Sequence, residues 1–373
     1  MMDFEQFKEH VQENIKDFLP PEYADASVTL AEVTKNNDVQ LTGVMIKTED
    51  MNIAPNIYLE GFFDKMKNGA DIDDVMADIA NVRVEHEMQS SFDTSIITDI
   101  DKVKDNIICK LVNAETNKEY LADKPFTQKE DLAIVYAVDL GSNSGGRMTA
   151  PITDSLMQQY GLNTEQLHDI AMENLDKAPL EFKSMRDVLA EMMFPDVDKN
   201  DPMISAMLPP EDPTTAMYVV TNEEKLKGAT AILNEKLMDD IADKLGGDFV
   251  VLPSSIHECI VLPMSENMDR STLENMVQEV NAGQVAPQER LSDHVYIYDS
   301  SEHEIVRTDK MEERNQNRAE SMDTVKEPLK AEKPQKKENS ITDKIARKQA
   351  EIKLNEATRE HPVKNKTKEV ALA

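Results

Sequence analysis

The sequence predicts an α+β protein with mixed or antiparallel sheets and packed helices, followed by a disordered, charged C-terminal tail. Two observations predict the body: β-rich runs recur in pairs joined by short polar turns, and runs with apolar residues at helical spacing alternate with them. The pairs favour hairpins over a doubly wound parallel sheet. A third observation predicts the tail, because the chain becomes uniformly polar from Glu302 onward.

Residues 1–147 are expected to form an N-terminal α+β lobe. Residues 3–18 carry apolar side chains at helical spacing, and Pro20 and Pro21 end that helix. The β-rich runs "SVTLAEVT" and "VQLTGVMI" flank "KNND" and predict a hairpin. Helices are expected over 55–69 and 71–87, and strands at "NIICKLVN" and "LAIVYAVDL".

Residues 148–300 are expected to form a C-terminal α+β lobe of the same body. Helices begin near 153 and 164, and a proline-rich loop follows "SMRDVLAEMMF". The pattern then predicts, in order, strand "AMYVVT", helix "ATAILNEKLMDDIADKL", strands "FVVLP" and "IHECIVLP", helix "STLENMVQEVNAG" and strand "HVYIYD".

The last residues differ from this body in composition. Residues 301–339 cannot bury enough apolar surface to offset their chain entropy, so they are expected to be a disordered linker. Within 340–373, "SITD" resembles a capping box that starts a short, coiled-coil-like helix. That helix has few hydrophobic residues and is marginally stable alone, which suits a tethered peptide that docks on a protein partner.

Net charge narrows the choice of partners. The formal charge of the 373 residues is -31, whereas the part from Glu302 onward is close to neutral, so the acidity lies in the body. An acidic body repels phosphate backbones, which argues against direct binding to nucleic acid or to an anionic membrane. Solubility explains such a charge, and mimicry of DNA is the alternative explanation.

The compartment follows from the cysteines and from the start of the chain. Cys109 and Cys259 both lie in apolar runs of strand type, where reduced thiols pack as small hydrophobic groups. The opening "MMDFEQFKEH" has acidic residues where a signal peptide is basic, and no apolar run reaches membrane-spanning length. These features predict a cytoplasmic protein.

The segment "VLPSSIHECIVLP" at 251–263 contains nearly every residue type used in nucleophilic catalysis. If it is a strand, Ser255, His257 and Cys259 share one face, while Ser254 and Glu258 lie on the other. Successive residues on one face are roughly 6.5 to 7 Å apart, too far for a direct hydrogen bond. A structural strand is therefore the first interpretation; a hydrolase using Ser254 or Ser255 with His257 and Glu258 requires partners from elsewhere.

Three other motifs are incomplete. "GSNSGGR" at 141–147 lacks the residues that complete a phosphate-binding loop and is interpreted as a hairpin turn. His86 and Glu87 begin a zinc-protease motif, but Ser90 stands where the second histidine is required. "DIDDVMAD" lacks the glycine and the final glutamate of a calcium loop. No metal ion and no cofactor is therefore expected.

Three segments carry a resemblance: "YVVTNEEKLKGATAILNEKLMDDIADKLGGDFVVLPSSIHECIVLP", "MVQEVNAGQVAPQERLSDHVYIYD" and "ITDSLMQQYGLNTEQLHDIAMENL". Over roughly residues 1–300 the chain resembles an uncharacterised domain-of-unknown-function family of Firmicutes, notably gut Clostridia. The genes of that family are often found in integrative and conjugative elements. The resemblance implies a mobile-element context and brings no catalytic residues.

Together these observations favour a cytoplasmic, non-enzymatic binding or accessory protein of a mobile genetic element. The two alternatives are the hydrolase centred on His257 and the acidic DNA mimic. The molecular function, the partner and the oligomeric state stay open at the level of sequence.

Overall fold

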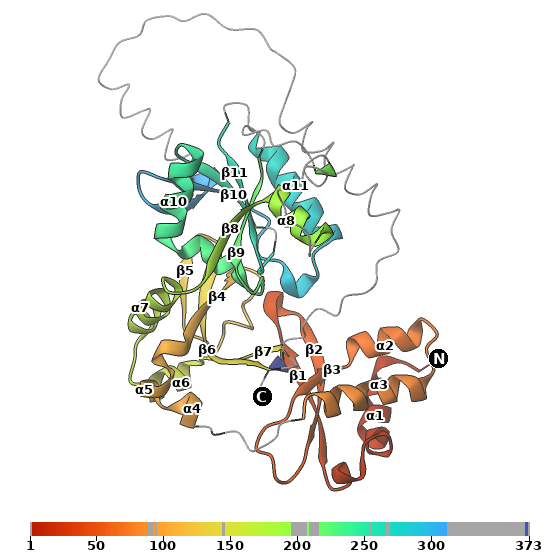
Figure 1. The fold of residues 1–373 in the computed structure, drawn as a ribbon. Coiled ribbons are helices and arrows are strands. Elements are labelled where there is room, and N and C mark those ends of the chain that lie inside the picture. Colours follow the sequence, from red (N-terminus) through yellow and green to blue (C-terminus); the bar gives the residue numbers. More distant parts are fainter. Residues whose placement is uncertain are drawn as a thin grey trace, which may run out of the picture.

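The computed structural model confirms an α+β fold with antiparallel sheets (Figure 1). It describes residues 2–87, 93, 95–143, 146–194, 207–208, 216–253, 255–265, 269–311 and 370–371. The tail expected over 340–373 lies outside the described residues, except for the two-residue strand β14 (Val370–Ala371), which pairs in parallel with β7. Within the described residues, no helix combines the length and the apolarity that a bilayer crossing requires.

The N-terminal unit is a three-stranded sheet covered by helices. Its strands lie in the order β1 (Ser27–Thr34), β2 (Gln40–Lys47) and β3 (Asn56–Tyr58). Its helices are α1 (Phe4–Asn14), α2 (Glu60–Lys67) and α3 (Ile72–Glu85). The β1–β2 hairpin confirms the sequence prediction. The helix expected from residue 55 begins only at Glu60, because Asn56–Tyr58 pairs with β2 as an edge strand.

A middle sheet follows, with β6 at its centre. Its strands are β4 (Ile107–Asn113), β5 (Phe126–Lys129), β6 (Leu132–Asn143) and β7 (Gly146–Pro151). Its helices are α4 (Ser95–Thr98), α5 (Ile100–Val103), α6 (Asp154–Gln159) and α7 (Thr164–Leu175). The antiparallel β6–β7 pair confirms that "GSNSGGR" joins two hairpin strands.

The C-terminal sheet has the strand order β13-β12-β10-β11-β9-β8. Its strands are β8 (Leu180–Ser184), β9 (Tyr218–Asn222), β10 (Phe249–Pro253), β11 (Cys259–Pro263), β12 (Tyr296–Asp299) and β13 (Glu304–Arg307). Its helices are α8 (Met185–Met193), α10 (Glu235–Leu245) and α11 (Arg270–Gly283).

The side chains of β10 alternate between the two faces of this sheet, and both faces are buried at this strand. Val250 and Leu252 pack with α11, whereas Phe249 and Val251 join the larger core that includes α10. Side chains of successive strand residues point to opposite faces, so one fully apolar strand serves two helix layers.

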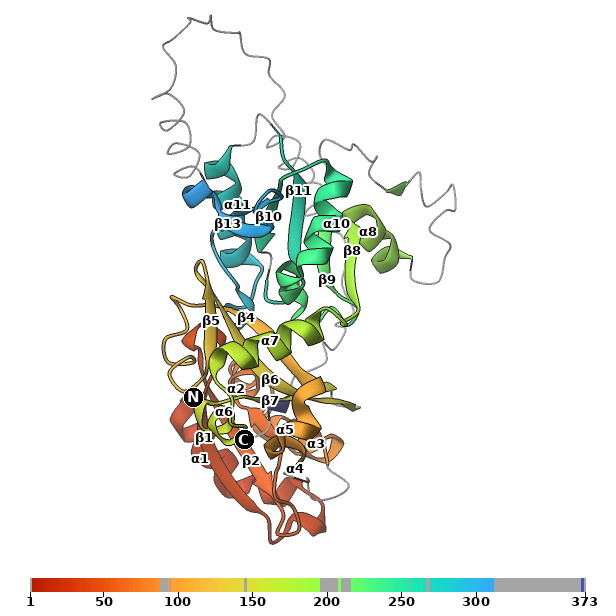
Figure 2. The ribbon, with the colours of Figure 1, turned by 90° about the vertical axis from the view of Figure 1, so that its left-hand side faces the viewer.

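The two largest hydrophobic clusters belong to different sheets. Residues 7–80 contain one hydrophobic cluster, and a second cluster joins the middle and C-terminal sheets. The boundary expected between residues 147 and 148 falls inside β7. The linker expected over 301–339 includes β13, where Ile305 and Val306 are buried in the sheet, and residues 312–339 lie outside the described residues. Figure 2 shows α7 in front of the middle sheet, with the C-terminal sheet above them.

A chain of polar contacts joins all three sheets. The side-chain amide of Asn37, in the β1–β2 turn, donates to the backbone carbonyls of Pro287 and Arg290. The Asn117 amide donates to the Asn37 side chain and to the carbonyl of Asn113. The N-terminal hairpin is thus held to both other sheets through hydrogen bonds.

Candidate functional site

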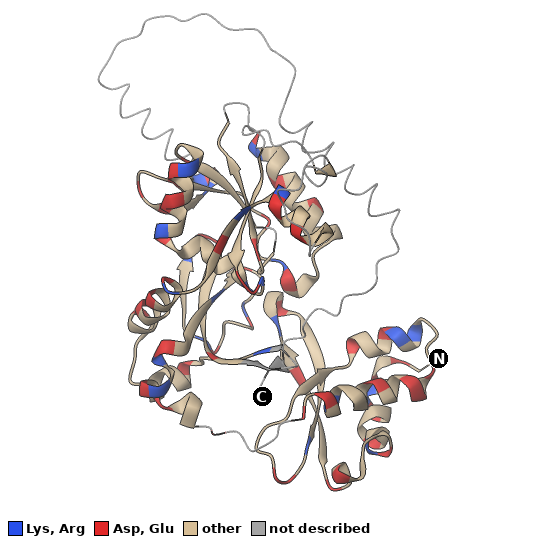
Figure 3. Cartoon of the chain, in the orientation of Figure 1, with Lys and Arg blue, Asp and Glu red and all other residues tan. Residues whose placement is uncertain are grey.

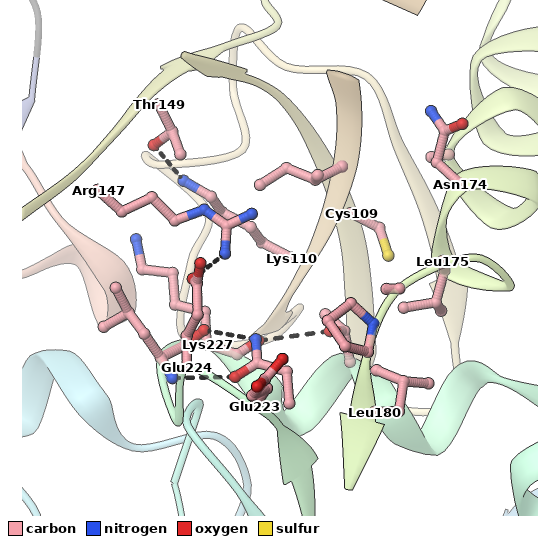
Figure 4. A pocket seen from close by; sticks show the side chains of 17 residues that line it. Cys109, Lys110, Arg147, Thr149, Asn174, Leu175, Leu180, Glu223, Glu224 and Lys227 are labelled. Atoms are coloured by element: carbon pink, nitrogen blue, oxygen red, sulfur yellow. Dashed lines mark hydrogen bonds and ion pairs between the residues drawn. The ribbon is translucent and has the colours of Figure 1, made fainter. Parts of the chain in front are cut away.

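A cavity of about 140 Å³ lies between the middle sheet and the C-terminal sheet (Figure 4). Four separate parts of the chain line it: β4, β7, the end of α7 with the residues before β8, and the loop after β9. The lining residues used below are Cys109, Lys110, Arg147, Leu175, Leu180, Glu223, Glu224 and Lys227.

One end of the cavity is charged and the other is apolar. In Figure 4, Lys110, Arg147 and Glu224 lie on one side, and Leu175 and Leu180 lie on the other. Such a division suits a small molecule with a polar head and an apolar body.

Arg147 connects the two sheets across the charged end. Its guanidinium pairs with Asp139 on β6, with Nη2 2.6 Å from Oδ2, and also with Glu224 in the loop after β9. The hydrogen bond to Asp139 is the main cause that raises the pKa of Arg147. Besides Arg147 and Glu224, the charged residues that line the cavity are Lys110, Lys227 and Glu223.

The second lysine, Lys227, belongs to a tightly built loop at residues 222–230. Lys225 and Lys227 both have a φ of 54°, in the left-handed region that non-glycine residues rarely adopt. The Asn222 side chain accepts from the Leu226 amide at 3.1 Å and donates to its carbonyl at 2.9 Å. These bonds hold the strained conformation.

Gly228 lets this loop lie directly against the next hairpin. A Cβ atom at position 228 would be 2.5 Å from the Asn222 nitrogen and 2.8 Å from the His257 carbonyl oxygen. Both are backbone atoms that cannot rotate away, so glycine is required by this close approach.

His257 supports this loop through hydrogen bonds. Its Nδ1 accepts a hydrogen bond from the Lys227 amide at 3.1 Å, and its carbonyl accepts from the Thr221 hydroxyl at 2.7 Å. Its Nε2 faces a carboxylate oxygen of Glu289 at 3.5 Å. Both ring nitrogens of this half-buried side chain therefore face groups other than a serine hydroxyl.

The other residues considered for catalysis lie in the turn between β10 and β11. The two strands expected at "FVVLP" and "IHECIVLP" are confirmed, but the second begins at Cys259 and not at Ile256, because the Ser255 amide bonds to the Glu258 carbonyl and closes a turn. The hydroxyl of the buried Ser255 accepts from the His257 amide at 3.0 Å and does not bond to the His257 ring. Ser254 lies outside the described residues.

The two cysteines are both buried, as expected for their apolar runs. Burial raises the pKa of Cys109 to about 12 and raises that of Cys259 further. Cys109 lines the cavity, whereas Cys259 lies in the core with no exposed area. The thiolate, which is the nucleophilic form, is therefore scarce at both positions near neutral pH.

Sequence reasoning missed the cavity, although it drew attention to the segment that contains His257. It singled out His257 as a catalytic candidate, and the structure uses that side chain to position Lys227. The quoted run "TNEEKLKGAT" did contain a signal, since charged residues followed by glycine are typical of a constrained turn.

Comparisons with known proteins place the chain in a family. No curated protein and no solved structure matches it. A family model described as a family of unknown function (DUF5688) matches residues 4–300, which contain every residue that lines the cavity. The chain therefore belongs to the family of unknown function DUF5688.

Proposed function

We propose that this chain is a non-enzymatic binding protein of the cytoplasm, encoded in a mobile element, that holds a small acidic molecule in the cavity between its middle and C-terminal sheets. The observation that carries the proposal is the built cavity itself, with cationic side chains at one end and an apolar wall at the other. The cytoplasmic location and the mobile-element context rest on the sequence and its resemblance.

The volume sets the size of the ligand. A cavity of about 150 Å³ is known to hold a molecule as large as benzene, and this one measures about 140 Å³. The part of the ligand that the cavity encloses should therefore be about the size of benzene. Benzoate and hexanoate are suitable probes.

The charges set the sign of the polar head. Among the lining residues, three basic side chains, Lys110, Arg147 and Lys227, stand against two acidic ones, Glu223 and Glu224, and this excess of positive charge favours an anion. The Lys110 ammonium also donates to the Thr149 hydroxyl at 2.8 Å, which fixes its position on the sheet. An ammonium held in place costs less entropy when it binds a carboxylate.

Binding in the cavity is favoured over the alternatives. The His257 ring faces the Lys227 amide and Glu289, which suits a role in support of the loop. Figure 3 shows acidic residues on elements around each of the three sheets. This spread favours a role of the charge in solubility over mimicry of DNA, which requires the charges to gather on one face.

Titration calorimetry with the full chain tests the proposal. Benzoate and hexanoate are expected to bind at least tenfold more tightly than hexanol or hexylamine, because only the acids place an anion beside the lysines. Lys110→Met should weaken the binding of benzoate at least tenfold. The control Lys118→Met alters an exposed lysine that does not line the cavity, and should change nothing.

Thiol alkylation locates the bound acid. Alkylation of Cys109 is slow because its thiolate is scarce, so it is followed over a long incubation. Because Cys109 lines the cavity, a bound acid should slow this reaction further while leaving Cys259 unaffected. Equal affinity for hexylamine and hexanoate, or no protection of Cys109 by any acid that binds, would contradict the proposal.

A further inference from the structure

A second group of side chains lies on the surface of the C-terminal sheet, away from the cavity. Glu235 and Asp239 are one helical turn apart on α10, and His303 comes from the turn between β12 and β13. One carboxylate oxygen of each acid and one ring nitrogen of the histidine all lie within 4.8 Å of one another.

We propose that Glu235, Asp239 and His303 bind a divalent transition-metal ion such as Zn²⁺. Ligands about 2.1 Å from a tetrahedrally coordinated ion lie roughly 3.4 Å apart. The three ligand atoms lie within 4.8 Å of one another, so they need to close by up to about 1.4 Å. Glu235 and His303 are exposed and can make that adjustment.

The donor set selects the class of ion. Two carboxylates and one imidazole suit zinc and its neighbours, whereas calcium and magnesium prefer oxygen ligands throughout. The exposed position leaves room for water to complete the coordination.

The carboxylate at the centre is already oriented. Nδ1 of His303 lies 2.7 Å from Oδ1 of Asp239, a contact that opens when the ring binds an ion. The Tyr298 hydroxyl, which is not among the ligands, donates to the same oxygen at 2.6 Å. A hydrogen bond of this kind from outside the coordination shell fixes a metal-binding carboxylate and tunes its affinity.

The site connects two elements that are distant in sequence. Its ligands come from α10 and from the β12–β13 turn, so a bound ion would hold that turn to the helix. An ion that binds the folded chain and not the unfolded chain stabilises the folded chain, so the midpoint of thermal unfolding should rise with metal concentration. The sequence suggested no metal, because 64 residues separate Asp239 from His303.

Calorimetry with ZnCl₂ on the full chain, freed of metal and carrying no polyhistidine tag, tests the site. One Zn²⁺ per chain is expected, with affinity at least tenfold weaker in His303→Ala and in Glu235→Gln. Two matched controls, His10→Ala and Glu302→Gln, alter a histidine in the N-terminal unit and an acid next to His303, and both should bind as the unaltered chain does.

Either of two results would overturn the proposal: no Zn²⁺ binding by the unaltered chain below 100 µM metal, or equal affinity in the unaltered chain, His303→Ala and Glu235→Gln. Both variants change exposed side chains, and circular dichroism verifies that they fold. If one is unfolded, the other decides. The site shares no residue with the cavity, so its failure leaves the cavity proposal unaffected.

Discussion

The backbone amide of Lys227 donates a hydrogen bond to Nδ1 of His257, 30 residues further along the chain, at a distance of 3.1 Å. This bond holds the left-handed residue that lines the cavity. His257→Ala removes the acceptor and, for a net bond worth about 1 kcal/mol, should speed hydrogen exchange of the Lys227 amide roughly fivefold. Exchange measured by mass spectrometry on peptides covering 222–230 checks this.

A conservative variant separates the bond from mere packing. In His257→Asn, the side-chain oxygen can occupy the place of Nδ1 and accept the same bond, so exchange at Lys227 should stay close to that of the unaltered chain. Equal acceleration in His257→Asn and His257→Ala would show that the ring acts by its volume.

Gly228 is expected to tolerate no side chain. In Gly228→Ala the new Cβ would meet two backbone atoms closer than 3 Å, and forced repacking of this kind costs about 1–3 kcal/mol of unfolding free energy. The matched control is Gly61→Ala within α2, where nothing lies within 4 Å of a new Cβ. There alanine should stabilise the chain by about 1 kcal/mol through its helix propensity. Urea unfolding of both variants measures the difference, and a Gly228→Ala chain as stable as the original would contradict the close approach.

The sequence predicted what depends on neighbouring residues. The helix over Phe4–Asn14, the β1–β2 hairpin and the buried strands at Cys109 and Val251 follow from local apolar spacing. The cavity could not be predicted, since Lys110, Arg147 and Lys227 meet only after two sheets pack together. The turn at Ser255–Glu258 was missed because its residues, in an apolar setting, resemble a strand until the two ends of the hairpin are paired.

Asp131 is expected to be the most sensitive carboxylate at the junction of the two sheets. It is 2 % exposed and accepts hydrogen bonds from Asn113, Ser292 and Tyr296 at 2.9, 2.7 and 2.6 Å. Asp131→Ala leaves three buried donors without an acceptor and should cost about 3 kcal/mol or more of unfolding free energy. The control Asp105→Asn, at an exposed position, should change stability by less than about 0.5 kcal/mol. Chemical denaturation measures the unfolding free energy of both variants. A similarly small loss of stability in each would show that Asp131 is not needed to hold the two sheets together.

His168 should make the stability of the chain fall in acid. Burial lowers the pKa of His168, whose Nδ1 lies 3.0 Å from the Tyr136 hydroxyl on β6; Asp169 opposes this shift and Lys129 adds to it. Because the folded pKa is below the unfolded value, near 6.5, the unfolded chain binds more protons as the pH falls through that value, and the folded state loses stability there.

His168→Gln removes this titration, so the difference in unfolding free energy between pH 8 and pH 5 should be smaller in the variant than in the unaltered chain. Tyr136→Phe keeps the ring buried and should retain the full difference, since desolvation is the main cause of the shift. Denaturant unfolding at both pH values compares the three chains. An identical pH difference in His168→Gln and the unaltered chain would mean that other groups govern the loss of stability in acid.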